Sequence, residues 1–210
     1  MSLPPLYFLI LSEQNEVSTF RTLNFKMTLR NLNYRIMINR FVLNEVSYFG
    51  PGAREVLPQE IKRLGLKKAF VSTDKDLIKF GVADKVLSVL DKAGIPYVVF
   101  SDIKPNPTVS NVNAGVKAFA ESGADFILAI GGGSSIDTSK AIGIITNNPE
   151  FSDVVSLEGV APTQKKSVPI IALPTTAGTA AEVTINYVIT DEVNEKKLSL
   201  IHISEPTRPY

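Results

Sequence analysis

Short, nearly uninterrupted apolar runs alternate with longer stretches of helical periodicity, and this alternation constrains the fold most. The runs FILAI and PIIAL fit strands that are covered on both faces. Strands separated by helices of ten or more residues form right-handed βαβ units. The sequence therefore predicts an α/β fold with a parallel sheet between helices. Strands are expected at 69–73, 96–100, 125–130 and 168–173, and helices at 54–64, from 78 to a stop at Gly94, at 108–122 and at 135–146.

Composition excludes several kinds of site. The 210 residues are enough for one sizeable core, or for one domain and the start of another. The formal net charge of +1 gives no electrostatic reason to expect nucleic acid or an anionic membrane as a partner. The absence of Cys excludes disulfides, thiolate metal sites and a cysteine nucleophile. The single His excludes a His-rich metal site and argues against a Ser-His-Asp triad.

The two ends of the chain differ from its middle. All 13 Gly lie between Gly50 and Gly178. Residues 1–36 have neither the basic residues before the apolar run that a secretory signal carries nor a run that spans a bilayer, so we expect a non-native extension, Met37 as the natural start and a cytoplasmic protein. Residues 198–210 resemble a translated sequencing adapter, in which case His202 has no chemical role. The native domain is expected at 37–197.

A glycine-rich turn follows the strand expected at 125–130. In parallel sheets ligands bind beyond the carboxyl ends of the strands, so the loops there are the candidate sites. Gly131, Gly132, Gly133 and Ser134 open a helix, and the missing side chains of the three glycines let backbone N–H groups approach a phosphate. The turn matches neither GxGxxG nor the P-loop. The alternative is a tight turn in which Ser134 and Asp137 form a capping box, and both interpretations can hold.

Other polar residues lie in the neighbouring loops. Asp74 follows the first expected strand, where a carboxylate can accept both ribose hydroxyls and repel a 2′-phosphate, which favours NAD over NADP. The alternative for Asp74 is a helix cap. The turn PTTAGT at 174–179 supplies threonine hydroxyls suited to phosphate and sugar oxygens, or else bonds only to itself. Asn106, between two prolines, can donate its amide to a cofactor or make an Asx turn.

Two strings in this order, GGGSSIDTSKA at 131–141 and PTTAGTAAEVT at 174–184, resemble the iron-activated alcohol dehydrogenases. The likeness extends through 37–53, 71–77, 104–108, 123–134, 141–151 and 186–192. It implies a Rossmann-like NAD-binding domain followed by a helical domain that holds Fe(II) through one Asp and three His. The cofactor-binding residues that the resemblance implies are Asp74, Asn106, Gly132, Gly133, Ser134, Asp137, Thr175, Thr176, Thr179, Asn186 and Lys197.

The resemblance also implies an activity and a departure from it. The family oxidises short alcohols or diols and reduces aldehydes or lactaldehyde-like hydroxyaldehydes, with NAD. Its metal ligands follow the position of Lys197, so we assign no catalytic and no metal-binding residue here and expect the helical domain to be missing and hydride transfer to be lost. The alternatives are a non-catalytic nucleotide-binding fragment and a fragment of a dehydroquinate-synthase-like sugar-phosphate enzyme. An edge strand at 37–44 would favour a homodimer.

Overall fold

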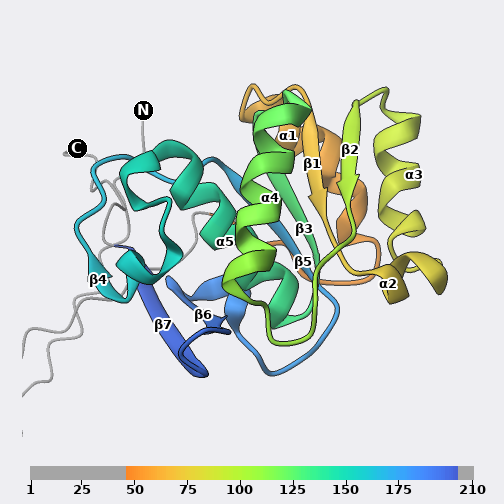
Figure 1. Ribbon diagram of the computed structural model, residues 1–210. Coiled ribbons are helices and arrows are strands. Elements are labelled where there is room, and N and C mark those ends of the chain that lie inside the picture. The colour runs from red at the N-terminus through yellow and green to blue at the C-terminus, as the bar shows by residue number, and fades with distance from the viewer. Residues whose placement is uncertain (1–45, 203–210) are drawn as a thin grey trace, which may run out of the picture. The chain divides into compact units, whose positions relative to one another are not determined.

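The computed structural model describes residues 46–202, and the expectations for 1–36 and 37–44 concern residues outside that range (Figure 1). Four strands of the described residues form a parallel sheet in the order β2-β1-β3-β5. Their bounds are Ala69–Ser72 for β1, Tyr97–Phe100 for β2, Phe126–Gly131 for β3 and Ile170–Pro174 for β5. All four expected strands are confirmed to within two residues, and so is the α/β fold class.

The helices also follow the expected pattern, with one difference. They are α1 (Leu57–Arg63), α2 (Lys75–Lys79), α3 (Asp84–Lys92), α4 (Val109–Ser122) and α5 (Gly133–Asn147). The stretch expected to continue from 78 to Gly94 is divided between α2 and α3, because Gly81 adopts a left-handed φ of 68°. Thr108 caps α4 by accepting a bond from the Asn111 amide, and Gly123 ends this helix in the left-handed region, as the sequence predicts.

The parallel sheet is covered on both faces because its apolar side chains alternate between them. Val71 and Leu128 pack with α1 and α3, whereas Phe70 and Ile127 pack with α4 and α5. Figure 1 shows α4 and α5 on one side of the strands and α1 on the other. β1 and β3 are buried along their whole length, which explains their nearly continuous apolar sequences.

The strand order places the glycine turn and the threonine turn at one edge. β3 and β5 pair in parallel, with Gly131 opposite Pro174, and the amide of Thr175 donates to the carbonyl of Gly131 over 2.9 Å. The order in which strands are added to the sheet reverses between β1 and β3, since β2 lies on one side of β1 and β3 on the other. A crevice at such a reversal is the usual ligand position in open parallel sheets.

A second sheet, which the sequence did not predict, packs on the far side of α5. It consists of β4 (Gly159–Ala161), β6 (Asn186–Asp191) and β7 (Lys196–His202) in the order β4-β7-β6. Tyr187, Ile189, Leu198 and Leu200 pack in one cluster with residues of α5, and both leucines are 0% exposed. The domain boundary expected after Lys197 therefore falls within β7.

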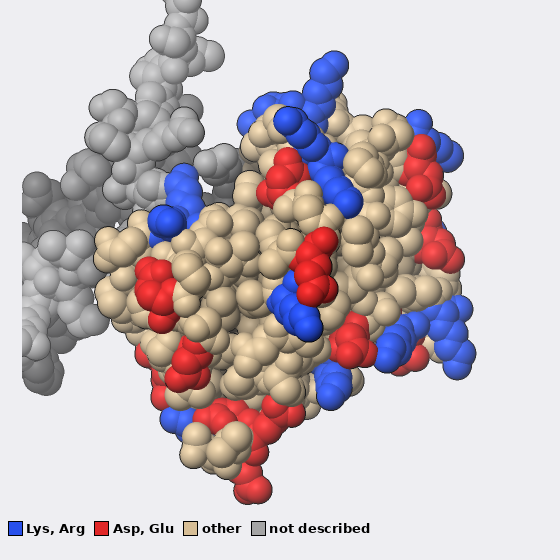
Figure 2. Space-filling model, turned by 45° about the horizontal axis from the view of Figure 1, so that its top comes forward, with Lys and Arg blue, Asp and Glu red and all other residues tan. Residues whose placement is uncertain are grey.

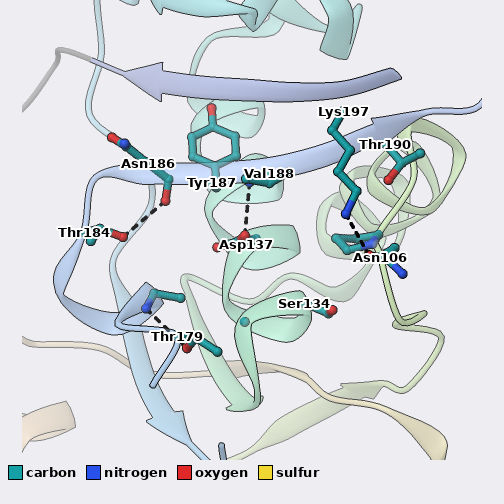
Figure 3. Close-up of a pocket in the computed structure, with 13 residues that line it drawn as sticks. Asn106, Ser134, Asp137, Thr179, Thr184, Asn186, Tyr187, Val188, Thr190 and Lys197 are labelled. Carbon is teal, nitrogen blue, oxygen red and sulfur yellow. Dashed lines mark hydrogen bonds between the residues drawn. The ribbon is translucent and has the colours of Figure 1, made fainter. Parts of the chain in front are cut away.

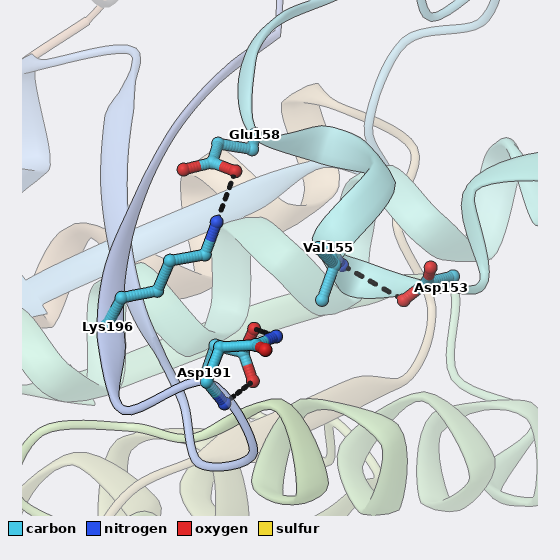
Figure 4. Close-up of polar contacts among 6 residues, drawn as sticks. Asp153, Val155, Glu158, Asp191 and Lys196 are labelled. Carbon is cyan, nitrogen blue, oxygen red and sulfur yellow. Dashed lines mark hydrogen bonds and ion pairs between the residues drawn. The ribbon is translucent and has the colours of Figure 1, made fainter.

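Polar contacts connect the strands of this second sheet near the turn between β6 and β7 (Figure 4). The carboxylate of Asp191 accepts bonds from the amides of Val193 and Asn194 and from the Asn194 side chain, at 2.6–3.1 Å, and so fixes the turn between β6 and β7. The ammonium of Lys196 on β7 lies 2.8 Å from the carboxylate of Glu158, just before β4. The three strands are thus connected at the same end that holds Lys197.

The charges on the surface and the length of the helices bear on the expected partners. Figure 2 shows basic and acidic side chains next to one another in several places on one face of the molecule. Of the helices within 46–202, none is long and apolar enough to cross a membrane. The expectation about nucleic acid and membranes stays a prediction from the net charge.

The close contact between α4 and α5 yields a test of the packing. A Cβ at Gly115 would lie 2.3 Å from Cδ1 of Ile142, which is fully buried. We expect Gly115→Ala to lower the free energy of unfolding by about 1–3 kcal/mol, because overpacking outweighs the better helix propensity of Ala. Urea denaturation measures this loss.

Ile142→Val supplies the control, because it removes Cδ1, the atom that the new Cβ would approach most closely. On its own it should cost about 0.5–1.5 kcal/mol, and it should cost less in the Gly115→Ala background. Strictly additive losses would contradict the steric explanation.

Candidate functional site

A cavity of about 510 Å³ opens beside the amino-terminal turns of α5 (Figure 3). Its wall joins the start of α5, the loop before α4, the segment between β5 and β6, and the strands β6 and β7. Seven of the expected site residues line the cavity: Asn106, Gly133, Ser134, Asp137, Thr179, Asn186 and Lys197. The structure therefore brings together side chains that are up to 91 positions apart in the sequence.

Two residues of the glycine turn, Gly131 and Gly132, have no room for a side chain. Gly131 has a φ of 152°, and a Cβ there would lie 2.2 Å from the Ser135 hydroxyl oxygen. A Cβ at Gly132 would lie 2.9 Å from Oγ1 of Thr176. The amides of the first turn of α5 have no acceptor within the helix, and the N-cap residue Gly132 offers no side chain to them. The turn therefore presents N–H groups at the positive end of a helix.

The capping box expected from Ser134 and Asp137 is not formed. Ser134 lies inside α5 rather than at its N-cap, and Asp137 reaches away from the first turn. Its carboxylate accepts a hydrogen bond of 3.0 Å from the Val188 amide on β6 (Figure 3). The box fails because the helix begins at Gly133, two residues earlier than 135, so the required spacing is lost.

The threonine turn faces the glycine turn. Thr179 lies 3.5 Å from the position of a Cβ on Gly133, and Thr176 borders Gly132. Thr175 is tied to Gly131 through its backbone amide. Thr179 lines the cavity, whereas Thr175 and Thr176 are not among its lining residues. The two turns thus lie against one another at the edge of the cavity.

Asp74 lies at the same edge of the sheet but outside the cavity. It is the N-cap of α2, with Oδ1 accepting from the Leu77 amide over 2.8 Å, which is the alternative that its sequence position left open. Its backbone pairs with that of Asp102, whose carboxylate lies 2.7 Å from the ammonium of Lys75. Capping occupies one carboxylate oxygen of Asp74.

Asn106 and Lys197 meet across the cavity mouth. Asn106 has a left-handed φ of 54°, and its side-chain oxygen accepts from Nζ of Lys197 over 3.3 Å. The carbonyl of Pro107 accepts from the Thr190 amide over 2.7 Å, which joins the loop before α4 to β6. The side chains therefore come from two segments whose positions are fixed by backbone pairing.

The electrostatics of the site centre on two charged residues of α5. Burial raises the pKa of Asp137, although the Val188 amide and the charge of Lys140 act in the opposite direction. Burial lowers the pKa of Lys140, against the charges of Asp137 and Glu182. Tyr187 is buried as well, and its pKa is raised for that reason. The site is consequently a partly dehydrated one, in which polar groups interact strongly.

Sequence reasoning missed several lining residues: Pro107, Ala181, Thr184, Tyr187, Val188 and Thr190. Most belong to β6 or to the segment before it. A strand at 186–191 could have been predicted from its β-branched residues, and in the structure Tyr187, Ile189 and Asp191 are buried at every second position. Lys140, which lies inside the GGGSSIDTSKA string, was likewise given no role.

Within residues 46–202, no three His, Cys, Asp or Glu side chains gather in a group that could hold a metal ion. The residues described here therefore do not fit an iron site, and no chemical step is assigned to a metal on this chain.

Comparisons with known proteins agree with this geometry. The family profile of the iron-containing alcohol dehydrogenases matches residues 44–209. The chain belongs to this family. It is 57% identical over 161 residues to the lactaldehyde reductase of Escherichia coli K12, which covers 77% of this chain and 42% of that protein.

Solved structures of the family have the same fold. A 1,3-propanediol oxidoreductase superposes with a TM-score of 0.74 at 36% identity, covering 79% of this chain and 43% of that one. A sulfoacetaldehyde reductase from Bifidobacterium kashiwanohense, solved in complex with NAD+, gives a TM-score of 0.69 at 31% identity, with 80% and 44% covered. The chain thus spans less than half the length of these family members.

Asp137 gives a pH-dependent test of the site. Asp137 is half-buried, and a carboxylate whose pKa is raised by partial burial disfavours the folded state above that pKa; this cost disappears as the pH falls through it. Asp137→Asn keeps an acceptor for the Val188 amide without the charge. We expect the stability of the Asn variant relative to the unsubstituted chain to be greater at pH 7 than at pH 3, measured by urea denaturation. The exposed Asp76→Asn is the control, and a Asp137→Asn difference that does not change with pH, or grows toward pH 3, would contradict the assignment.

Proposed function

We propose that this chain is the NAD-binding part of an oxidoreductase that interconverts a short aldehyde or hydroxyaldehyde and its alcohol or diol. The observation that carries the proposal is the contact between the glycine turn and the threonine turn beside a cavity that Gly133, Ser134 and Thr179 line. A dinucleotide has an anionic pyrophosphate between two hydroxyl-rich sugars, so it needs N–H donors at its centre and neutral polar groups on both sides.

The residues of the glycine turn suit the pyrophosphate. The amides of Gly133 and Ser134 belong to the first turn of α5, and Gly132 has no side chain that would block the approach. Lys197 adds a positive charge at the mouth. We assign Gly132, Gly133 and Ser134 to the pyrophosphate on this basis.

Neutral and acidic groups suit the sugars and the nicotinamide. Asp74 accepts from Leu77 through one oxygen, and its second oxygen is assigned to the adenosine ribose. A carboxylate there repels a 2′-phosphate, which favours NAD over NADP. The remaining groove is assigned to Asn106, Asp137, Thr175, Thr176, Thr179, Asn186 and Lys197.

The substrate class is proposed from the family. Related proteins include a lactaldehyde reductase and a 1,3-propanediol oxidoreductase, which act on small oxygenated molecules by their names. Bound NAD would supply the hydride chemistry, and the residues of this chain would bind and orient it. Because residues 46–202 assemble no metal site, we propose that the 210-residue chain binds the cofactor without oxidising an alcohol by itself.

Titration of the full 210-residue chain with NAD in a calorimeter tests the proposal. We expect saturable binding, and Gly132→Ala should weaken it about tenfold or more, because the new Cβ would meet Oγ1 of Thr176 at 2.9 Å and crowd the approach to the amides of the turn. Gly65→Ala is the control: its φ of 70° makes it a strained substitution too, but a Cβ there meets nothing within 4 Å and lies away from the cavity. A folded chain that shows no binding at millimolar NAD would overturn the proposed function.

Asp74 tests the choice between NAD and NADP. Asp74→Asn keeps an oxygen that can cap α2 and removes the negative charge. We expect the ratio of NADP affinity to NAD affinity to rise about tenfold, which is roughly 1.4 kcal/mol of lost repulsion. Competition calorimetry with both cofactors measures the ratio, and Asp76→Asn on the exposed side of α2 should leave it unchanged. An unchanged ratio in Asp74→Asn would remove Asp74 from the ribose site.

A further inference from the structure

One segment forms much of the cavity wall and has little regular structure of its own. Residues 179–186, here called the strap, connect the threonine turn to β6 and contain a single 3-10 turn, Ala181–Val183. Thr179, Ala181, Thr184 and Asn186 of the strap line the cavity (Figure 3). A strap without a ladder of backbone bonds needs another source of restraint to keep these groups in place.

Lys140 supplies such a restraint from α5. Its ammonium donates to the carbonyl oxygens of Ala181, Thr184 and Asn186 over 2.6, 2.7 and 2.9 Å. An ammonium has three N–H donors, so three carbonyls satisfy it. The residue is only 8% exposed, and these contacts are therefore made away from bulk water. One side chain thus holds the strap at three points spread over six residues.

Two other features indicate that the backbone conformation of the strap is determined by its surroundings. Ala180 adopts a left-handed φ of 52°, a conformation that non-glycine residues keep only when their surroundings determine it. Asp137, one turn before Lys140 on α5, accepts from the Val188 amide just beyond the strap. The same helix therefore binds carbonyls of the strap through a cation and the following strand through an anion.

We infer that Lys140 is a positioning residue that pre-forms the strap wall of the cofactor cavity, so that Thr179, Thr184 and Asn186 are in place before the cofactor binds. This inference rests on the proposed NAD function. Lys140 itself is not assigned a contact with the cofactor, and its effect passes through the carbonyls of the strap.

Lys140→Met in the full 210-residue chain removes the ammonium and keeps an unbranched side chain. NAD titration should show a dissociation constant raised about tenfold or more, because the strap loses its three bonds. Lys117→Met, on the exposed face of the neighbouring helix α4, is the matched control and should bind NAD within about twofold of the unsubstituted chain. Circular dichroism of each variant checks that the fold is retained.

Chemical rescue separates positioning from simple loss of stability. Because the chain has no Cys, Lys140→Cys introduces a single thiol. Alkylation with 2-bromoethylamine in denaturant, followed by refolding, gives a side chain with the length and charge of lysine, whereas iodoacetamide gives a neutral one. The amine adduct should regain NAD affinity to within about threefold, and the neutral adduct should remain as weak as Lys140→Met.

The outcomes distinguish the two claims. Absence of NAD binding by the unsubstituted, folded chain overturns the proposed function. Binding that is the same in Lys140→Met as in the unsubstituted chain, or equal in the two adducts, overturns the inference alone. If the variants do not fold, hydrogen exchange of the unsubstituted chain decides: peptides from 179–188 must be protected without NAD, and exchange there at the rate of an unstructured peptide contradicts a pre-formed strap.

Discussion

The parallel pairing of β3 with β5 is the constraint on which the site depends. With Gly131 opposite Pro174, the turns that follow the two strands leave the sheet at the same level, and the Thr175 amide bonds to the Gly131 carbonyl. Every later contact requires this register: Thr176 against Gly132, Thr179 against Gly133, and the strap lying over α5. A slip of one residue would turn the side chains of β5 to the opposite face and separate the two turns.

Much of this sheet could be predicted from the sequence because its signals are local. The run at 126–131 is apolar because both faces of the sheet are covered there, and the helix ends carry their own markers in Thr108 and Gly123. The run at 170–174 lies at the edge of the sheet and is only half-buried, so the expectation of burial on both faces is wrong for this strand. The position of the candidate site follows from the same information, since the carboxyl ends of parallel strands are the usual ligand edge. Seven of the eleven expected cofactor residues line one cavity, although their roles stay predictions.

The parts that the sequence did not yield depend on contacts between distant segments. A capping box at Ser134 and Asp137 is a reasonable local pattern, but the Val188 amide, 51 residues later, takes the carboxylate instead. The strap carbonyls that bind Lys140 are 41–46 residues away from it. Residues 198–210 resemble a translated adapter, so the sequence predicts no strand there, and strand β7, in which Leu198 and Leu200 are buried at alternate positions, is not expected.

Helix α5 explains why these distant contacts meet where they do. It lies between the two sheets, with Ile142 packed toward the parallel sheet and Ile144 and Ile145 toward β6 and β7. A helix so enclosed would be most stable with apolar residues on every face, because a buried ion gains less from its partners than hydrophobic packing can supply. Asp137 and Lys140 are nevertheless present, both with pKa values shifted by burial against the charged form. Stability alone does not account for them, whereas the need to hold one particular wall beside the cavity does.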